Sequence, residues 1–179
     1  MNITKQHLTH IIKEELGLML NESEAGAPIF KGYLGWQVPN NLVDTQGVDP
    51  RMISNRTQRD GQDTYHITII SPPETREIMK KLKTEKGLSG GQAKKAVKSE
   101  LLERTAALSD SSFTIGKIKS IDGPGDGSVG AKGEPSAAVF KTVISPDAQA
   151  LRAEYGLPPK DLHITLGIGD NGDVHGTKN

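Results

Sequence analysis

The clearest pattern along the chain is a set of short apolar runs bounded by proline and glycine. Two of them, residues 65–70 and 162–168, are rich in β-branched residues, which predicts two strands. Segments 113–121 and 137–144 alternate apolar and polar residues and also predict strands. We expect one more strand over residues 30–38, because Pro39 ends that run.

Helical spacing separates these strands. Residues 74–83 and 92–107 contain good helix formers and are divided by glycines, so they predict two helices. Ser145 followed by Pro146 predicts a helix that starts there and runs to about Tyr155. The polar segment 40–63 is interpreted as a long loop, and the glycine-rich segment 122–135 as a mobile hairpin loop.

At the N-terminus, apolar residues recur every three or four positions over about residues 3–20 and predict an amphipathic helix. We therefore divide the chain into a helix and linker (1–27), one domain (28–169) and a loose polar tail (170–179). The helix is expected to dock on the domain or to mediate self-association. The order of the remaining elements predicts an α+β fold with two similar halves.

The composition removes several classes of protein. The 179 residues include 22 basic and 22 acidic side chains, so nothing favours non-specific binding to long nucleic acid or to an anionic membrane. The absence of cysteine excludes disulfides, thiolate zinc sites and a thiol nucleophile. There is no apolar run of membrane-spanning length, so we expect a cytoplasmic protein without a membrane partner.

Two of the five histidines lie in nearly identical settings. The sequences Tyr65-His66-Ile67-Thr68-Ile69 and Leu162-His163-Ile164-Thr165-Leu166 place each histidine two positions before a threonine on a predicted strand. Residues i and i+2 of a strand share a face, so each motif presents an imidazole beside a hydroxyl. Packing alone would favour valine at these positions, which argues for function.

This set of side chains fits the cleavage of a phosphodiester. One histidine can activate the attacking oxygen and the other can protonate the leaving oxygen, while Thr68 and Thr165 donate to the charged phosphoryl oxygens. The sequence does not assign the base and the acid. No metal-binding motif is present, and we expect neither a metal nor another cofactor.

The paired motifs resemble those of the 2H phosphoesterase superfamily, with a resemblance that covers about residues 28–169. This superfamily includes RNA 2′,3′-cyclic phosphodiesterases, also called 2′,5′-RNA ligases, as well as 2′,5′-oligoadenylate phosphodiesterases and phage enzymes that destroy cyclic-oligonucleotide defence signals. The resemblance implies two pseudo-symmetric lobes whose central antiparallel sheets line a cleft, with helices outside. It also implies His66, Thr68, His163 and Thr165 as catalytic residues and a nucleotide or short RNA as substrate. A phage protein would act in the host cytoplasm.

Further residues are candidates for binding the substrate. Trp36 or Tyr33 could stack on a base, although a core position is an equal alternative for Trp36. Lys141 could contact phosphate or face solvent, and Arg56, with Arg51 and Arg59, could cover an anionic ligand. Asp161 could orient His163 or simply begin the strand.

Three functions remain open from the sequence. The first is a phosphodiesterase for 2′,3′-cyclic phosphates or for 2′,5′-linked or cyclic oligonucleotides. The second is a non-catalytic RNA- or nucleotide-binding module, and the third is a structural protein tethered by the N-terminal helix.

Overall fold

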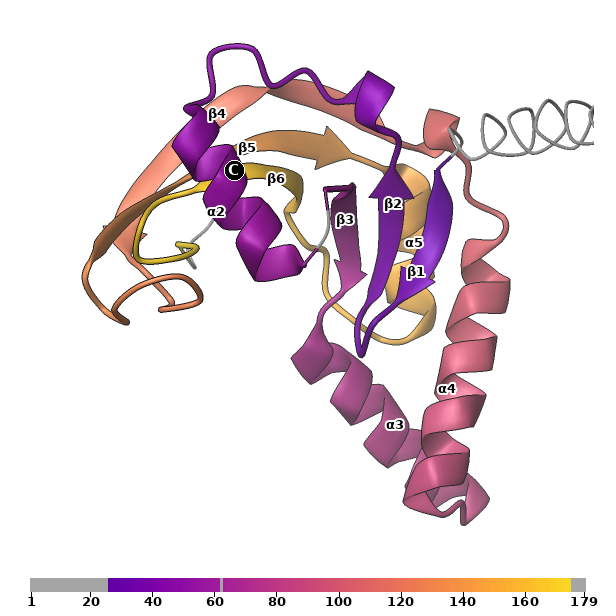
Figure 1. The fold of residues 1–179 in the computed structure, drawn as a ribbon. Coiled ribbons are helices and arrows are strands. Elements are labelled where there is room, and N and C mark those ends of the chain that lie inside the picture. Colours follow the sequence, from indigo (N-terminus) through magenta and orange to yellow (C-terminus); the bar gives the residue numbers. More distant parts are fainter. Residues whose placement is uncertain (1–25, 62, 175–179) are drawn as a thin grey trace, which may run out of the picture.

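Six strands form one antiparallel sheet in the computed structural model, which describes residues 26–61 and 63–174 (Figure 1). The strands follow the order β1-β2-β3-β6-β5-β4 across the sheet. The predicted α+β class is therefore confirmed for the described residues. The predicted N-terminal helix and the last residues of the predicted tail lie outside them. The described part contains no helix that is long and apolar enough to cross a bilayer.

The strands agree with the sequence prediction except at the N-terminal end. β3 (Tyr65–Ile70) and β6 (Leu162–Ile168) lie where expected, and β4 (Thr114–Pro124) and β5 (Pro135–Ile144) form a long hairpin. The prediction of a single strand over residues 30–38 is wrong. The segment belongs to a hairpin of β1 (Ala27–Phe30) and β2 (Leu34–Val38), whose turn contains Gly32 at a φ of 77°. Glycine adopts this conformation without the penalty that other residues incur.

Three of the helices begin and end near their predicted bounds: α3 (Pro72–Lys86), α4 (Gly90–Thr105) and α5 (Pro146–Glu154). A further helix, α2 (Pro50–Asp60), replaces most of the loop predicted over residues 40–63. Asp49 accepts a hydrogen bond from the Arg51 amide at its start, and Gly61 ends it in the left-handed region. A polar cap followed by proline begins both α2 and α5, so the signal was present in the sequence.

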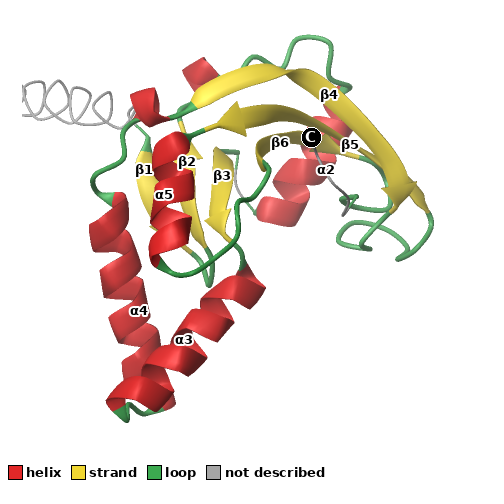
Figure 2. Cartoon of the chain, turned by 180° about the vertical axis from the view of Figure 1, so that it is seen from behind, coloured by secondary structure: helices red, strands yellow, loops and turns green. Residues whose placement is uncertain are grey.

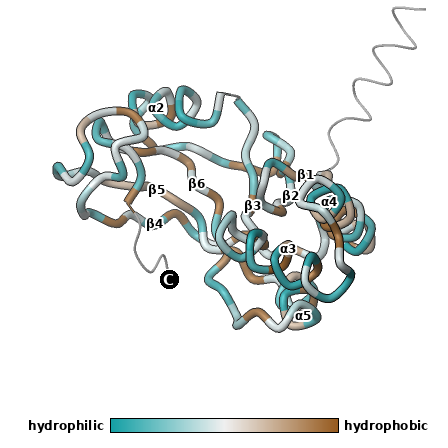
Figure 3. The backbone as a smooth tube through the Cα atoms, turned by 90° about the horizontal axis from the view of Figure 1, so that it is seen from below, coloured by the Kyte–Doolittle hydropathy of each residue, from teal (hydrophilic) through white to brown (hydrophobic). Residues whose placement is uncertain are grey.

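The helices cover the two faces of the sheet unequally. α5 lies over one face of the sheet, and α2 lies on the other face against β6 (Figures 1 and 2). An added Cβ at Gly167 would lie 2.8 Å from the Met52 Cβ of α2, so this glycine permits the close approach of helix and strand. α3 and α4 form a hairpin that projects from the sheet and is mostly hydrophilic (Figure 3).

The centre of the sheet joins the two motif strands. β3 and β6 are antiparallel, and Ile67 pairs with Ile164, so the middle residues of the two motifs are opposite each other. Both isoleucines are completely buried in the core. The resemblance implied two lobes with sheets of their own, whereas the described residues form one continuous sheet.

The segment after β6 packs on the domain up to residue 174, which corrects the prediction of a loose tail from residue 170. The side chain of Asn171 donates to the Pro135 carbonyl and accepts a hydrogen bond from the Ala131 amide. Val174 is buried and bridges to Gly125. These contacts also tie the glycine-rich β4–β5 loop to the C-terminal segment at several points.

Candidate active site

The two predicted motifs line one pocket. Because Ile67 and Ile164 pair and face the core, the residues on either side of them project from the opposite face of the sheet. That face opens into a pocket of about 760 Å³. Its lining includes both histidines and both threonines of the motifs: His66, Thr68, His163 and Thr165.

His66 is held against an aromatic ring. The centroid of its imidazole lies 5.5 Å from that of Tyr33, which also lines the pocket. Burial lowers the pKa of His66, Asp60 raises it, and the positive charges of Arg59, Lys31 and Arg56 lower it further. The imidazole is therefore biased towards the neutral form, which can accept a proton.

His163 has a different environment. Its Nδ1 lies 3.3 Å from the backbone carbonyl oxygen of Asp161, and its ring meets Phe140 edge to face. A carbonyl oxygen can only accept a hydrogen bond, so this contact favours the tautomer with a proton on Nδ1. The sequence suggested that Asp161 could orient His163, and in the structure the main-chain carbonyl of Asp161 makes this contact.

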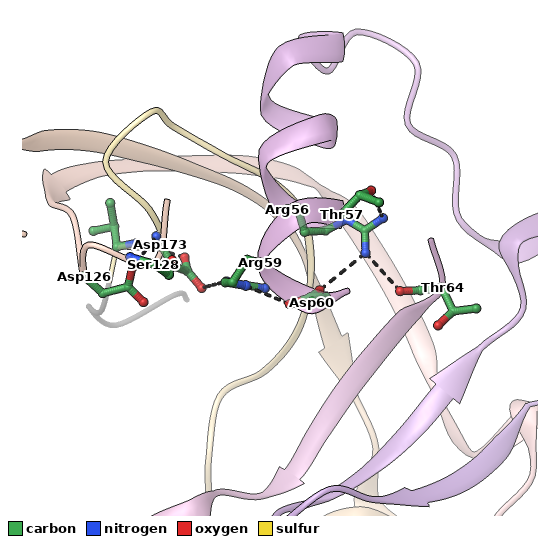
Figure 4. A network of polar contacts seen from close by, with 9 residues as sticks. Arg56, Thr57, Arg59, Asp60, Thr64, Asp126, Ser128 and Asp173 are labelled. Atoms are coloured by element: carbon green, nitrogen blue, oxygen red, sulfur yellow. Dashed lines mark hydrogen bonds and ion pairs between the residues drawn. The ribbon is translucent and has the colours of Figure 1, made fainter. Parts of the chain in front are cut away.

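One wall of the pocket comes from the end of α2. Arg59 donates from Nε to Asp60 at 2.7 Å and from Nη1 to Asp173 at 2.7 Å, and all three side chains line the pocket. Figure 4 shows this guanidinium between the two carboxylates. The pKa of Arg59 is raised because the two carboxylates outweigh its burial. The two ion pairs therefore hold the guanidinium of Arg59 in place at the pocket, beside both carboxylates.

Arg56 does not lie at the pocket, in contrast to the sequence-based hypothesis. Its side chain is only 1% exposed and packs over the Tyr65 ring, with 4.2 Å between Cζ and the ring centroid. It donates to the Thr64 carbonyl at 2.9 Å and pairs with Asp60 (Figure 4). Arg56 therefore stabilises the connection between α2 and β3, and its neighbour Arg59 lines the pocket instead.

Trp36 and Lys141 also lie away from the pocket. Trp36 is 3% exposed, packs against Phe113 and donates from Nε1 to Asp110 at 2.9 Å, so it occupies the core. Lys141 pairs with Ile164 and therefore lies on the face of the sheet opposite His163. Of the candidates for contact with the substrate or with His163, Tyr33, Arg59 and Asp161 line the pocket.

Several residues of the pocket were not predicted from the sequence. They are Asp60, Asp173 and Lys160, and Lys160 lies in a proline-rich turn. Asp60 could have been found from the Asp49-Pro50 helix start. In a helix that begins there, Asp60 lies four positions after Arg56 and one after Arg59, close to two residues that were already candidates. Lys160 had no comparable signal.

The described residues contain no group of three histidine, aspartate or glutamate side chains positioned to hold a metal ion. Two carboxylates line the pocket near the ends of α2 and of the C-terminal segment. They belong to Asp60 and Asp173, and both are paired with Arg59.

A comparison with protein families gave a match to the Swiss Army Knife 2H phosphoesterase domain over residues 37–175. This match includes both motifs and most of the chain, so the protein belongs to the 2H phosphoesterase family. Phosphoester chemistry is the class of activity that this membership implies. Searches of curated proteins and of solved structures gave no match.

Proposed function

We propose that the protein is a metal-independent phosphodiesterase that cleaves a nucleotide-derived phosphodiester by paired-histidine acid–base catalysis. The candidate substrates are 2′,3′-cyclic phosphates of nucleotides or RNA ends, and 2′,5′-linked or cyclic oligonucleotides. The observation that carries the proposal is the single pocket lined by both His-x-Thr motifs. Family membership supports the reaction class.

The two histidine environments support a division of roles. His66, whose lowered pKa favours the neutral form, takes the proton from the attacking water or ribose hydroxyl. The attacking oxygen bonds to phosphorus, and the bond from phosphorus to the leaving ribose oxygen breaks. His163 donates a proton to that oxygen from Nε2 while Nδ1 keeps its contact with the Asp161 carbonyl. The proton balance is closed because one histidine gains the proton that the other loses.

Three groups are suited to the phosphoryl oxygens. Thr68 and Thr165 lie on the same face as the histidines and can donate their hydroxyl protons to the equatorial oxygens. Arg59 adds guanidinium N–H donors, and its bonds to Asp60 and Asp173 hold the group in place before the substrate arrives. The ring of Tyr33 offers a surface for a nucleobase.

The proposal is tested by a chromatographic screen of 2′,3′-cyclic nucleotides, 2′,5′-oligoadenylate and cyclic di- and trinucleotides in the presence of EDTA. We expect cleavage of at least one substrate without added metal. His66→Ala and His163→Ala should each lower kcat by about 10²- to 10⁴-fold, the usual contribution of a general acid or base.

Thr114→Val is a matched control for Thr68→Val and Thr165→Val, because Thr114 is exposed on β4 and does not line the pocket. The control should retain wild-type kcat, whereas the two motif variants should lose activity. Full activity of both histidine variants, or loss of all activity in EDTA, contradicts the proposal. Binding of these ligands without turnover indicates the non-catalytic binding module instead.

A further inference from the structure

A second pocket adjoins the one that contains the motifs. It has a volume of about 420 Å³ and lies between the end of β5 and the start of α5. Lys160 and Asp161 line both pockets, so the two pockets adjoin at these residues. None of the four motif side chains lines the second pocket, although its Thr142 pairs with His163 across β5 and β6. A ligand that occupies both must therefore extend past Lys160.

The walls of the second pocket are part apolar and part polar. Ile144 lines it and is 68% exposed, which is unusual for a large aliphatic side chain. Pro146 adds a second apolar surface, and Thr142 supplies a hydroxyl. An apolar surface next to hydrogen-bonding groups is suited to a nucleobase and its ribose.

Lys160 lies at the junction of the two pockets, and two hydrogen bonds hold its backbone. Its amide donates to the side-chain oxygen of Gln149 at 3.1 Å, and the Gln149 amide group donates to the Lys160 carbonyl at 2.7 Å. None of the ion pairs among the described residues includes Lys160. Its ammonium group is thus a half-buried charge that no carboxylate of that part of the chain neutralises by direct contact.

The environment of Lys160 favours an anionic ligand. Burial lowers its pKa, the positive charge of Arg152 lowers it further, and Glu74 partly offsets these effects. The Glu74 carboxylate itself is engaged by Arg152, with 2.8 Å between Oε1 and Nη2. A phosphate at the junction would supply the missing counter-charge and would stabilise the ammonium form. Asp161 lines both pockets as well, and its carboxylate cannot attract a phosphate, so Lys160 is the residue of the junction suited to that contact.

From this geometry we infer that the second pocket binds the nucleoside next to the reacting one, and that Lys160 contacts the phosphate between them. The preferred substrate then carries at least two phosphates and is an oligonucleotide rather than a cyclic mononucleotide. This inference rests on the proposed function, because it names the substrate class of the same site. It assigns Lys160 and Ile144 as specificity-determining residues.

Calorimetry with two ligands that do not react tests the inference directly. Adenosine 3′-monophosphate has one phosphate, and diadenylate with a 3′-phosphate has a second phosphate and a second nucleoside. We expect the diadenylate to bind the full-length protein at least about 10-fold more tightly, the usual worth of a hydrogen bond to a charged group. Lys160→Gln should remove most of this difference, and Ile144→Asp should reduce it by repelling the second nucleotide.

The chain offers a control for each variant. Lys141→Gln removes a lysine of β5 on the face of the sheet opposite His163, and Ile118→Asp places a carboxylate at another exposed isoleucine outside both pockets. Both controls should keep the wild-type affinity ratio to within about twofold, since neither residue lines a pocket and exposed substitutions have small effects.

Turnover of 2′,3′-cyclic AMP and of diadenylate 2′,3′-cyclic phosphate separates this inference from the proposed function. Equal affinities for the two unreactive ligands, or an unchanged ratio in both Lys160→Gln and Ile144→Asp, overturns the second subsite even if both cyclic phosphates are hydrolysed. A tighter diadenylate complex that depends on Lys160 supports the subsite even if neither cyclic phosphate is cleaved, and the proposed catalytic function is then the part that fails.

Discussion

At the level of single residues, burial and the neighbouring charges together determine the direction in which the pKa of His66 is shifted. Burial, Arg59 and Arg56 lower the pKa of His66, and Asp60 raises it. The arginine and the aspartate are themselves paired, with 2.7 Å between Arg59 Nε and Asp60 Oδ1. The two residues therefore oppose each other in their effect on one imidazole while they hold each other in place.

This opposition predicts shifts of opposite sign in the pH profile. If neutral His66 is the base, kcat/KM of the wild type should fall as the pH drops through a pKa below the ordinary 6.5 of histidine. Arg59→Gln removes a positive charge and should move this acid limb to higher pH. Asp60→Asn removes a negative charge and should move it to lower pH.

The midpoint of the acid limb, rather than the maximal rate, is the measurement, because Arg59 is also proposed to contact phosphate. Arg51→Gln is the control, since Arg51 is exposed on the same helix and pairs with Asp170. Its limb should coincide with that of the wild type. Shifts of the same sign in Arg59→Gln and Asp60→Asn would disprove the assignment of His66 as the base.

At the level of elements, α2 depends on its contact with β6. The helix brings Arg59 and Asp60 to the pocket, and Gly167 lets Met52 approach the strand. Gly167→Ala should lower the free energy of unfolding by about 1–3 kcal/mol, the cost of overpacking a close contact. It should also lower kcat/KM, because a displaced α2 moves the charges of the pocket wall.

Urea denaturation measures the first effect, and the cleavage assay measures the second. Gly91→Ala is the matched control, because an added Cβ there meets no atom within 4 Å and alanine favours the helix α4. The control should be at least as stable as the wild type. A Gly167→Ala protein with unchanged stability would show that the contact between α2 and β6 does not limit the fold.

At the level of the whole molecule, an ion pair between buried Arg152 and partly exposed Glu74 joins α5 to α3. Arg152 of α5 is 1% exposed and donates to Glu74 of α3 and to the Ile69 carbonyl at the end of β3. Burial raises the pKa of Glu74, but hydrogen bonds from Arg152 and Ser71 lower it to about 2. The pair thus connects the end of one motif strand to two helices.

This pair predicts a specific loss of stability in acid. Because the folded pKa of about 2 is below the ordinary value of 4.5, the stabilisation is complete above pH 4.5 and is lost as the pH falls towards 2. Glu74→Gln should lower the free energy of unfolding at neutral pH by about 1.5–3 kcal/mol and should remove this part of the acid dependence.

Denaturant titrations at several pH values check this expectation. Glu77→Gln is the control, because Glu77 is exposed on the same helix and makes none of the ion pairs found among the described residues. The control should keep the wild-type acid dependence. An acid dependence in Glu74→Gln equal to that of the wild type would show that other groups govern it.

The sequence by itself determined the motif strands, the later helices, the α+β class and, within each motif, the common strand face of histidine and threonine. These features depend on local spacing, because strand alternation and helix caps are set within a few residues. The sequence also carried the signal for α2 in Asp49-Pro50, but the segment contains few apolar residues beyond Met52 and Ile53 and therefore resembles a polar loop.

Only the tertiary structure decided how these elements meet. The pairing of Ile67 with Ile164 brings the two motifs together, and no local pattern encodes a partner so distant in the chain. The same holds for Arg59, which reaches Asp173 across the fold, and for Lys160, which joins two pockets. The tertiary structure also decided that Arg59 and Tyr33 line the pocket, whereas Arg56 and Trp36 are buried away from it. Burial is a property of the whole packing arrangement and not of one residue's neighbours in sequence.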